Sequence, residues 1–196
     1  MPGRASPLPG RLPGLLLFLP ALALAAAFKG VDHDHWTDEY DHHFRKHAKH
    51  YFGPAFDWRW FKAQAIAESG LDPRARSRSG AVGIMQILPS TFRYIRKKNP
   101  LLAAADLKDP AWNIAAGIFY DRYLYDKWEE ELAPGLERLF FAFGAYNAGH
   151  MRVRRAYNKA VQREGRVSRW AQVEPLVPGQ TRHYVRRIRR LMAEVL

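Results

Sequence analysis

Apolar residues recur at intervals of three, four and seven positions along most of the chain, which is the period of an amphipathic helix. One such stripe consists of Trp58, Phe61 and Ala65. Almost no segment alternates apolar and polar residues as a half-buried strand does. The pattern therefore predicts helices over residues 38–50, 58–69, 89–98, 112–128, 136–147, 151–163 and 182–195.

Glycine, proline and capping residues mark the ends of these predicted helices. Gly70 is suited to end the second helix, Pro134 to open the fifth at its first position, and Thr181 to cap the last. Residues 71–83 are rich in Gly, Ser and Asp-Pro, so they are predicted to form a loop. Residues 84–88 are a short apolar piece that could be helical or extended.

The predicted helix over residues 136–147 is apolar on nearly every face, with Leu139, Phe140, Phe141 and Phe143 close together. A helix of that kind is expected to be the buried centre of the fold. We see no internal repeat. The expected fold class is mainly α, a single domain with little or no β-sheet.

The N-terminus has the features of an export signal. Arg4 and Arg11 precede an apolar run over residues 12–28, which ends in small residues of the Ala-x-Ala type. This order is typical of a secretory signal peptide over residues 1–27. The alternative is an uncleaved N-terminal anchor, although Pro13 and Pro20 argue against a good membrane-spanning helix. Either way, the rest of the chain is expected to be exported to the periplasm or secreted.

Composition narrows the class of partner. The 196 residues are 47% hydrophobic and carry a formal net charge of +12, which favours a polyanionic partner. Cysteine is absent, so disulfides, thiol nucleophiles and Cys-ligated metals are excluded. Export makes nucleic acid an unexpected partner and points to the anionic polymers of the cell envelope. Many basic residues lie within 152–190, either as a solvated face or as a surface attracted to anionic murein or membrane lipid.

Glu68 is the most unusual residue in the pattern. It continues the apolar stripe of the second helix and lies in that helix's last turn, where the helix dipole disfavours a negative charge. Apolar neighbours and the dipole both raise the pKa of a carboxyl group, as a general acid working near neutral pH requires. The alternative is a structural glutamate that is paired with Arg59 or Arg93. Periodicity alone leaves both possibilities open.

Four motifs then resemble one family, in the family's order, over about residues 55–190. Segment 68–73 (ESGLDP), continued by residues 77–91, resembles the first motif of the soluble-lytic-transglycosylase-like family. Segment 145–149 (AYNAG) is similar to the second. Asn113-Ile114 with Gly117 and Tyr120 resembles the intervening helix, and residues 181–185 (TRHYV) resemble the closing segment. Several motifs at family spacing are far more specific than one short pattern.

The resemblance implies a lysozyme-like, mainly helical fold that cleaves the MurNAc–GlcNAc bond of peptidoglycan glycan strands without water. Glu68 matches the single catalytic acid/base. The residues that match the family's substrate-contacting positions are Ser77, Gln86, Tyr120, Tyr146, Asn147 and Tyr184. Of these, Tyr146 is the one expected beside Glu68, and the alternative is a core tyrosine that is bonded to a backbone carbonyl. Gln180-Thr181 stands where many members have Glu-Thr, so no role is carried over to position 180.

The resemblance also implies a reaction with no metal or cofactor, performed by a monomer. Glu68 protonates the leaving oxygen and then takes the proton of the MurNAc C6 hydroxyl, giving a 1,6-anhydro end. A hydrolytic muramidase and a non-catalytic wall-binding module are the alternatives. Asp72, beside Pro73, is expected to act in a turn rather than in catalysis. The expected organisation is a signal peptide or anchor over 1–27, a His-rich helical extension over 28–53 and the catalytic domain over 54–196.

His43, His47 and His50 lie at i, i+4 and i+7 of the first predicted helix. That spacing could hold Zn²⁺ or Cu²⁺. The favoured interpretation is an exposed polar face that happens to be rich in histidine, because three exposed histidines rarely form a closed site. We therefore expect no metal site.

Overall fold

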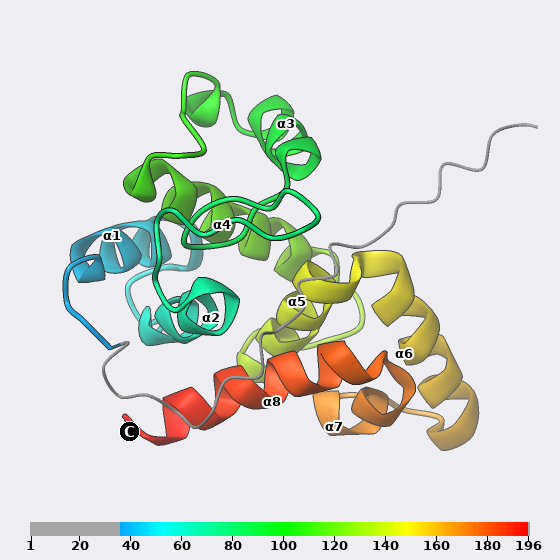
Figure 1. Cartoon of the computed structure of the whole chain (residues 1–196). Helices are drawn as coiled ribbons and strands as arrows, with labels where there is room; N and C mark the ends of the chain where they lie inside the picture. The colour runs from blue at the N-terminus through cyan, green and yellow to red at the C-terminus, as the bar shows by residue number, and fades with distance from the viewer. Residues whose placement is uncertain (1–35, 196) are drawn as a thin grey trace, which may run out of the picture.

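The computed structural model describes residues 36–195, and the described chain consists of helices joined by turns and loops (Figure 1). Its elements are α1 (Asp41–Phe52), α2 (Arg59–Ser69), α3 (Pro89–Lys98), η2 (Pro100–Leu102), α4 (Pro110–Asp126), α5 (Leu136–Ala148), α6 (His150–Glu164), α7 (Trp170–Val173), η3 (Glu174–Leu176) and α8 (Gly179–Ala193). The seven longer helices all correspond to helices that the hydrophobic pattern predicts. The short elements η2, α7 and η3 were not predicted, because a single turn is too short to show a period.

The roles predicted for Pro134 and Thr181 at helix starts were wrong. Helix α5 begins at Leu136, so Pro134 lies before it and does not open it. Helix α8 begins at Gly179, so Thr181 lies inside its first turn. There the Thr181 hydroxyl donates to Asn147 Oδ1 at 2.9 Å and joins α8 to the end of α5 instead of capping its own helix.

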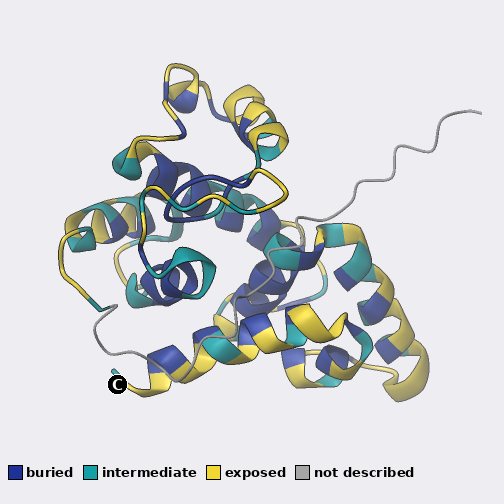
Figure 2. Cartoon of the chain, in the orientation of Figure 1, coloured by how far each residue is buried: buried dark blue, intermediate teal, exposed yellow. Residues whose placement is uncertain are grey.

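Helix α5 lies at the centre of the molecule and packs against α4, α6, α7 and α8. The side chains of Leu139, Phe141 and Phe143 are completely buried. Figure 2 shows the same helix in the colour of buried residues, with exposed residues on the outer faces of the helices around it. The predicted buried central helix is therefore confirmed.

No β-sheet forms among residues 36–195, which confirms the expected fold class. Between α2 and α3 the chain is a long loop in which Val82 makes isolated antiparallel bridges with Arg76 and with Ile87. Residues 84–88 are therefore turn and extended chain rather than helix. This loop matters for the site, because it runs beside the end of α2.

The side chain of Asn113 on α4 fixes this loop. Its Oδ1 accepts from the backbone N–H of Met85 at 2.8 Å, and its Nδ2 donates to the carbonyls of Val82 at 3.0 Å and Leu107 at 2.9 Å. The approach is so close that a Cβ added at Gly83 would lie 2.5 Å from the Asn113 amide nitrogen. Three buried hydrogen bonds from one side chain hold the loop to α4, and each would leave an unpaired buried group if it were lost.

Helix α1 is part of the folded body rather than a separate arm. It packs against α4 and α2 and buries Phe44 and Ala48. Its Asp41 carboxylate receives the buried ammonium group of Lys62 on α2 at 2.5 Å. The expected signal peptide or anchor lies outside the described residues. Within residues 36–195, no helix combines the length and the apolar character needed to cross a bilayer.

Candidate active site

Glu68 lies in the last turn of α2, which ends at Gly70 in the left-handed conformation (φ 67°). Its carboxylate Oε1 accepts a hydrogen bond from the hydroxyl of Tyr184 on α8 at 2.6 Å. The following residue, Ser69, donates from its hydroxyl to the carbonyl of Ile84 at 2.8 Å and so ties the end of α2 to the loop. Three separate segments, α2, the loop and α8, therefore meet at this end of α2.

Burial raises the pKa of Glu68 to about 7, although the Tyr184 hydrogen bond and the charge of Arg187 both act to lower it. The residue as a whole keeps intermediate exposure to solvent, whereas its carboxyl group is surrounded by protein atoms. A carboxyl group with this proton affinity is protonated in an appreciable fraction of molecules at neutral pH. It can therefore serve as a general acid and, after losing the proton, as a general base.

The alternative of a structural ion pair with Arg59 or Arg93 does not hold for Arg59. The guanidinium of Arg59 instead binds the Asp57 carboxylate at 2.7 Å, at the start of α2. The cation that acts on Glu68 is Arg187 of α8, whose guanidinium donates to the carbonyls of Ile66 at 3.4 Å and Ala67 at 3.3 Å. Arg187 thus lies against the negative end of the α2 dipole, beside Glu68.

Tyr146 lies close enough to Glu68 for the Glu68 charge to act on its pKa, but its hydroxyl takes the alternative partner, a backbone carbonyl. The Tyr146 hydroxyl donates to the backbone carbonyl of Met85 at 2.7 Å, so its partner is the loop, and Tyr184 takes the position beside Glu68. The physical reason is the fixed loop, which presents a carbonyl that no backbone donor satisfies. Burial raises the pKa of Tyr146 well above its usual value, and the nearby Asp121 and Glu68 add to the shift.

The other residues of the first two motifs make hydrogen bonds that stabilise the loop and join α5 to α8. The Ser77 hydroxyl accepts from the backbone N–H of Ala81 at 2.9 Å. Gln86 has a positive φ of 46°, and its amide nitrogen donates to the carbonyl of Gly83 at 2.9 Å, which stabilises the turn. Asn147 accepts the bond from Thr181 described above. Contact between these residues and a substrate remains a prediction.

Tyr120 joins the site to a tyrosine-lined pocket of about 360 Å³. Its ring packs edge-on against Tyr146 at 5.5 Å between centroids and is stacked on Tyr123 at 6.1 Å. The pocket is lined by Ser90, Thr91, Tyr94, Tyr120, Tyr123, Leu124, Lys127 and His150. Flat aromatic faces with hydroxyl groups at their rims are suited to binding sugar rings.

Sequence reasoning missed a second carboxyl group, that of Asp121 on α4, which is completely buried. Its Oδ1 accepts from Gln64 Nε2 at 3.1 Å, and its Oδ2 has no hydrogen-bond partner among residues 36–195. Burial raises its pKa well above the usual value, and the charge of Glu68 adds to the shift. The signal was available, because Ile114, Ile118 and Asp121 form one helical stripe, as Glu68 does on α2.

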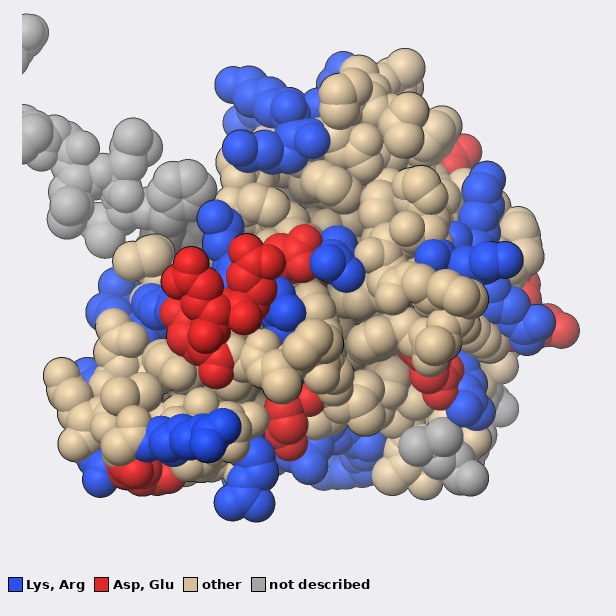
Figure 3. All heavy atoms as spheres, turned by 180° about the vertical axis from the view of Figure 1, so that it is seen from behind, with Lys and Arg blue, Asp and Glu red and all other residues tan. Residues whose placement is uncertain are grey.

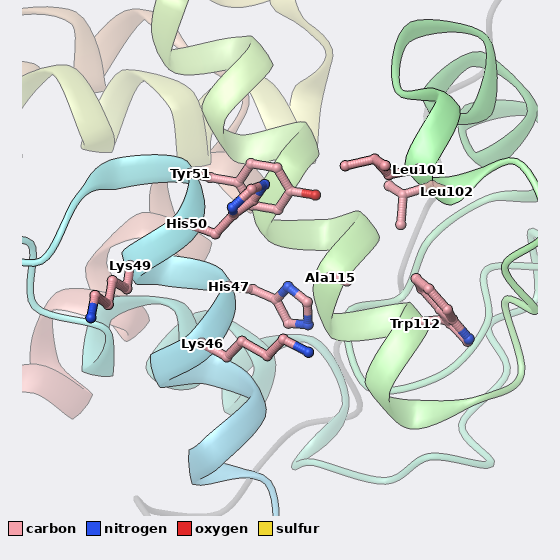
Figure 4. Close-up of a pocket in the computed structure, with 9 residues that line it drawn as sticks. All are labelled: Lys46, His47, Lys49, His50, Tyr51, Leu101, Leu102, Trp112 and Ala115. Atoms are coloured by element: carbon pink, nitrogen blue, oxygen red, sulfur yellow. The ribbon is translucent and has the colours of Figure 1, made fainter.

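Asp72 and the three histidines of α1 were also considered as candidates for a functional role. Asp72 is exposed, and its Oδ1 accepts from the backbone N–H of Arg74 at 2.8 Å, which confirms the predicted turn role. His47 and His50 line a different cavity, between α1 and α4 (Figure 4), whereas His43 packs against His42 with 3.7 Å between ring centroids. In the part of the chain that the structure describes, no group of three or more His, Cys, Asp or Glu residues could hold a metal ion.

The net positive charge does not coat the surface evenly. Figure 3 shows a face on which a cluster of acidic side chains lies between groups of Lys and Arg. The basic residues of the C-terminal part are partly neutralised as well. Arg186 on α8 binds the Glu174 carboxylate at 2.9 Å, and Arg154 on α6 pairs with Glu131.

Comparison with known proteins identifies the family to which this chain is similar. The family model described as "Transglycosylase SLT domain" matches residues 47–168. Proteins named membrane-bound lytic murein transglycosylase F are similar to this chain. The one from Salmonella typhimurium is 31% identical over 137 residues, which is 69% of this chain and 24% of that protein. The one from Yersinia pestis is 30% identical over 153 residues, which is 77% of this chain and 29% of that protein. The chain thus spans only about a quarter of the length of these curated relatives.

Solved structures agree with the sequence comparison. The 70 kDa soluble lytic transglycosylase from Escherichia coli is 27% identical, with a TM-score of 0.60 over 78% of this chain and 23% of that one. A structure of the 70 kDa enzyme in complex with bulgecin A is 28% identical, with a TM-score of 0.60 over 77% of this chain and 23% of that one. An inactive mutant of the Pseudomonas aeruginosa lytic transglycosylase Slt, in which a glutamate is replaced by glutamine, is 25% identical with a TM-score of 0.62, again over 77% and 23% of the two chains.

Proposed function

Because the chain belongs to the transglycosylase SLT domain family, we propose that it is an exported lytic transglycosylase that cleaves the MurNAc–GlcNAc β-1,4 bond of peptidoglycan without water. The observation that carries the proposal is the environment of Glu68. One carboxyl group, with a pKa of about 7, lies at the end of α2 with a tyrosine hydroxyl on its oxygen and a guanidinium group nearby. This is the environment that a single residue needs if it is to act first as an acid and then as a base.

The proposed reaction has two proton transfers through Glu68. In the first, the protonated carboxyl gives its proton to the glycosidic oxygen as the C1–O bond breaks, which releases the GlcNAc hydroxyl end. In the second, the Glu68 carboxylate takes the proton of the C6 hydroxyl of the same MurNAc, and O6 forms a bond with C1. The product is a 1,6-anhydroMurNAc end, and Glu68 returns to its protonated form.

A single carboxylate suffices if the substrate supplies the second group. Most glycosidases place two carboxylates about 5–10 Å apart, on either side of the bond. Asp72 is engaged in its turn, and Asp121 is completely buried, so neither is suited to contact a sugar. The N-acetyl oxygen of MurNAc can stabilise the developing charge at C1, as in substrate-assisted enzymes.

The glycan strand is proposed to run past Glu68 along the residues that match the family's substrate positions. In this arrangement Tyr184 and Tyr146 lie closest to the reacting bond, and Ser77 and Gln86 belong to the loop. Asn147 belongs to the end of α5, and Tyr120 leads into the tyrosine-lined pocket. The basic face of α6 and α8 adds an attraction to anionic murein or to a membrane surface. We propose that the protein acts as a monomer in the cell envelope, without nucleic acid or cofactor.

Digestion of purified sacculi tests the proposal. The wild-type protein is expected to release fragments that weigh one water less than hydrolysis products, as measured by mass spectrometry. Glu68→Gln should keep the fold and reduce turnover by at least ~10²–10⁴-fold, the usual contribution of general acid–base catalysis. Asp72→Asn is the matched control, since it removes a nearby exposed carboxylate from a turn and should leave turnover unchanged.

Two results would contradict the proposal in different ways. Reducing ends of full mass would show that water is the acceptor, and the protein would then be a hydrolytic muramidase that uses the same Glu68. A Glu68→Gln variant that keeps half of the wild-type rate would remove Glu68 from the chemistry altogether.

A further inference from the structure

A cavity of about 650 Å³ lies between α1, η2 and the first turns of α4 (Figure 4). It is lined by Lys46, His47, Lys49, His50, Tyr51, Leu101, Leu102, Trp112 and Ala115. None of these residues belongs to the site around Glu68. Asn113 and Gly117 contact the loop before α3 from α4, whereas Trp112 and Ala115 of the same helix line the cavity. The cavity is therefore separated from the proposed glycan cleft by α4.

One wall of the cavity is apolar and unusually open to solvent. Leu101 is 72% exposed and Trp112 is 41% exposed, and both belong to a set of only four large hydrophobic side chains that are exposed in the described part of the chain. Two such residues on one cavity, with Leu102 and Ala115 behind them, form an apolar surface that lacks a covering segment among residues 36–195. Exposed apolar residues gathered at a concave site are typical of ligand binding.

The opposite wall, from α1, supplies polar groups and positive charge. In Figure 4 the Lys46 side chain runs from α1 toward Trp112, the His47 ring lies between the two helices, and the Tyr51 hydroxyl points toward Leu101, whereas Lys49 points away. The Tyr51 hydroxyl accepts from Asn99 Nδ2 at 3.1 Å, so its own proton can be donated to a ligand. Burial lowers the pKa of His47 to about 4, so its ring is neutral at neutral pH and offers an N–H donor.

The charged residues that line the cavity are all positive. Lys46 and Lys49 are cations, and no Asp or Glu is among the nine residues. Within the described part of the chain, neither lysine forms an ion pair. A ligand must therefore bring at least one anionic group for Lys46, acceptors for Tyr51 and His47, and an apolar portion for Leu101 and Trp112.

We propose that this α1–α4 cavity binds a short acidic peptide with small apolar side chains. Its carboxylate would pair with Lys46, its backbone carbonyls would accept from Tyr51 and His47, and its apolar side chains would lie on Leu101 and Trp112. The volume is within the range of pockets that hold ligands of this size. The proposal rests on the proposed function only for the source of the peptide, which would be the peptide portion of peptidoglycan. A second attachment point of this kind raises the residence of the enzyme on a polymer through effective concentration.

Calorimetric titration of the full chain tests the cavity directly. The probes are the N-acetylated peptide Ala-Glu-Ala-Glu-Ala and its neutral counterpart Ala-Gln-Ala-Gln-Ala. We expect the acidic peptide to bind at least tenfold more tightly than the neutral one, and Lys46→Glu and Leu101→Ser each to weaken it at least tenfold. Lys97→Glu, at an exposed position on α3, and Met151→Ser, at an exposed position on α6, lie outside the cavity lining and are matched controls that should leave binding within twofold of the wild type.

A second measurement uses the Glu68→Gln protein, so that binding is separated from turnover. On sacculi, adding Lys46→Glu should increase the fraction of unbound protein, and the increase should disappear on sacculi from which an amidase has removed the peptides. Equal binding of the two probe peptides, or loss of binding in the control variants, would overturn the proposal. So would binding to phosphatidylglycerol vesicles that needs Lys46 while the acidic peptide does not bind. None of these results depends on which ends the enzyme produces.

Discussion

Glu68 and Tyr184 come from segments that are 116 residues apart, and their contact is one of the influences on the proton affinity of the carboxyl group. The Tyr184 hydroxyl donates to the charged form, so it lowers the pKa of Glu68 and opposes the larger effect of burial. The first chemical step needs the protonated carboxyl. The rate is therefore expected to fall as pH rises through the pKa of Glu68.

Tyr184→Phe removes the donor and should raise the pKa of Glu68. The alkaline limb of the profile of kcat/KM against pH, measured on sacculi, should move to higher pH. Tyr146→Phe is the comparison, because the Tyr146 hydroxyl binds the Met85 carbonyl instead. Tyr146→Phe should lower the free energy of unfolding by about 1–2 kcal/mol. It should shift the pH profile of kcat/KM less than Tyr184→Phe does. Equal movement in both variants would contradict the assignment of Tyr184 as the partner of Glu68.

At this scale the sequence predicted Glu68, Tyr146 and Tyr184 as candidate residues but not which of them bond to one another. Glu68 could be identified because an acid on an apolar stripe is rare, and Tyr146 and Tyr184 through motifs. The choice between the two tyrosines depends on where the Met85 carbonyl points, and that follows from long-range packing of the loop rather than from any local pattern. The same limit explains why Arg187, 119 residues from Glu68, was not considered as its cation.

Helix α4 and the loop before α3 form the element that carries the site. A Cβ added at Gly117 would lie 2.7 Å from Met85 Cγ and 2.8 Å from Met85 Cβ, well inside normal contact. Only glycine lets the helix approach the loop so closely. The Met85 carbonyl, which holds Tyr146, depends on this approach.

Gly117→Ala should therefore force Met85 away from α4. We expect a loss of about 1–3 kcal/mol in the free energy of unfolding, the usual cost of overpacking, together with reduced turnover. Gly179→Ala is the control, because a Cβ there would meet no atom within 4 Å. Urea denaturation of both variants measures the difference. A Gly117→Ala protein as stable as the control would show that the loop adjusts at no cost.

The longer helices could be predicted from the period of their apolar residues. The residues at which they begin and end were predicted less accurately. The predicted helix over residues 112–128 begins at Pro110 in the structure, because Asp109 caps it by accepting from the Trp112 N–H at 3.0 Å. The start of α8 was misplaced because Thr181 satisfies a distant side chain instead of its own helix. Local capping rules fail where tertiary contacts compete for the same hydroxyl.

At the scale of the whole molecule, Asp121 makes stability depend on pH. Its pKa is raised well above the usual value, so between about pH 4 and that raised pKa the folded chain holds a proton that the unfolded chain releases. The stability that this proton provides is fully present below the unfolded pKa and is lost as pH rises. The buried acid thus lowers the free energy of unfolding at neutral and alkaline pH.

Asp121→Asn removes this dependence while keeping an oxygen for Gln64. The variant should gain stability relative to the wild type as pH rises, by up to about 1.4 kcal/mol per pH unit within the window above. Asp106→Asn, at an exposed position, should follow the wild type. Urea unfolding at a series of pH values measures the gap. A gap that stays constant with pH would mean that Asp121 is ionised in the folded protein.

The guanidinium of Arg187 against the last carbonyls of α2 has a consequence for the energetics of turnover. Glu68 alternates between neutral and negative forms during the proposed cycle, and a site that had to rearrange for each form would add reorganisation free energy to the barrier. Here Arg187 already compensates the helix end when Glu68 is neutral, and Tyr184 is already in place to receive the charge when it forms. The dipoles are oriented before the proton moves, which is the preorganisation by which enzymes stabilise developing charge.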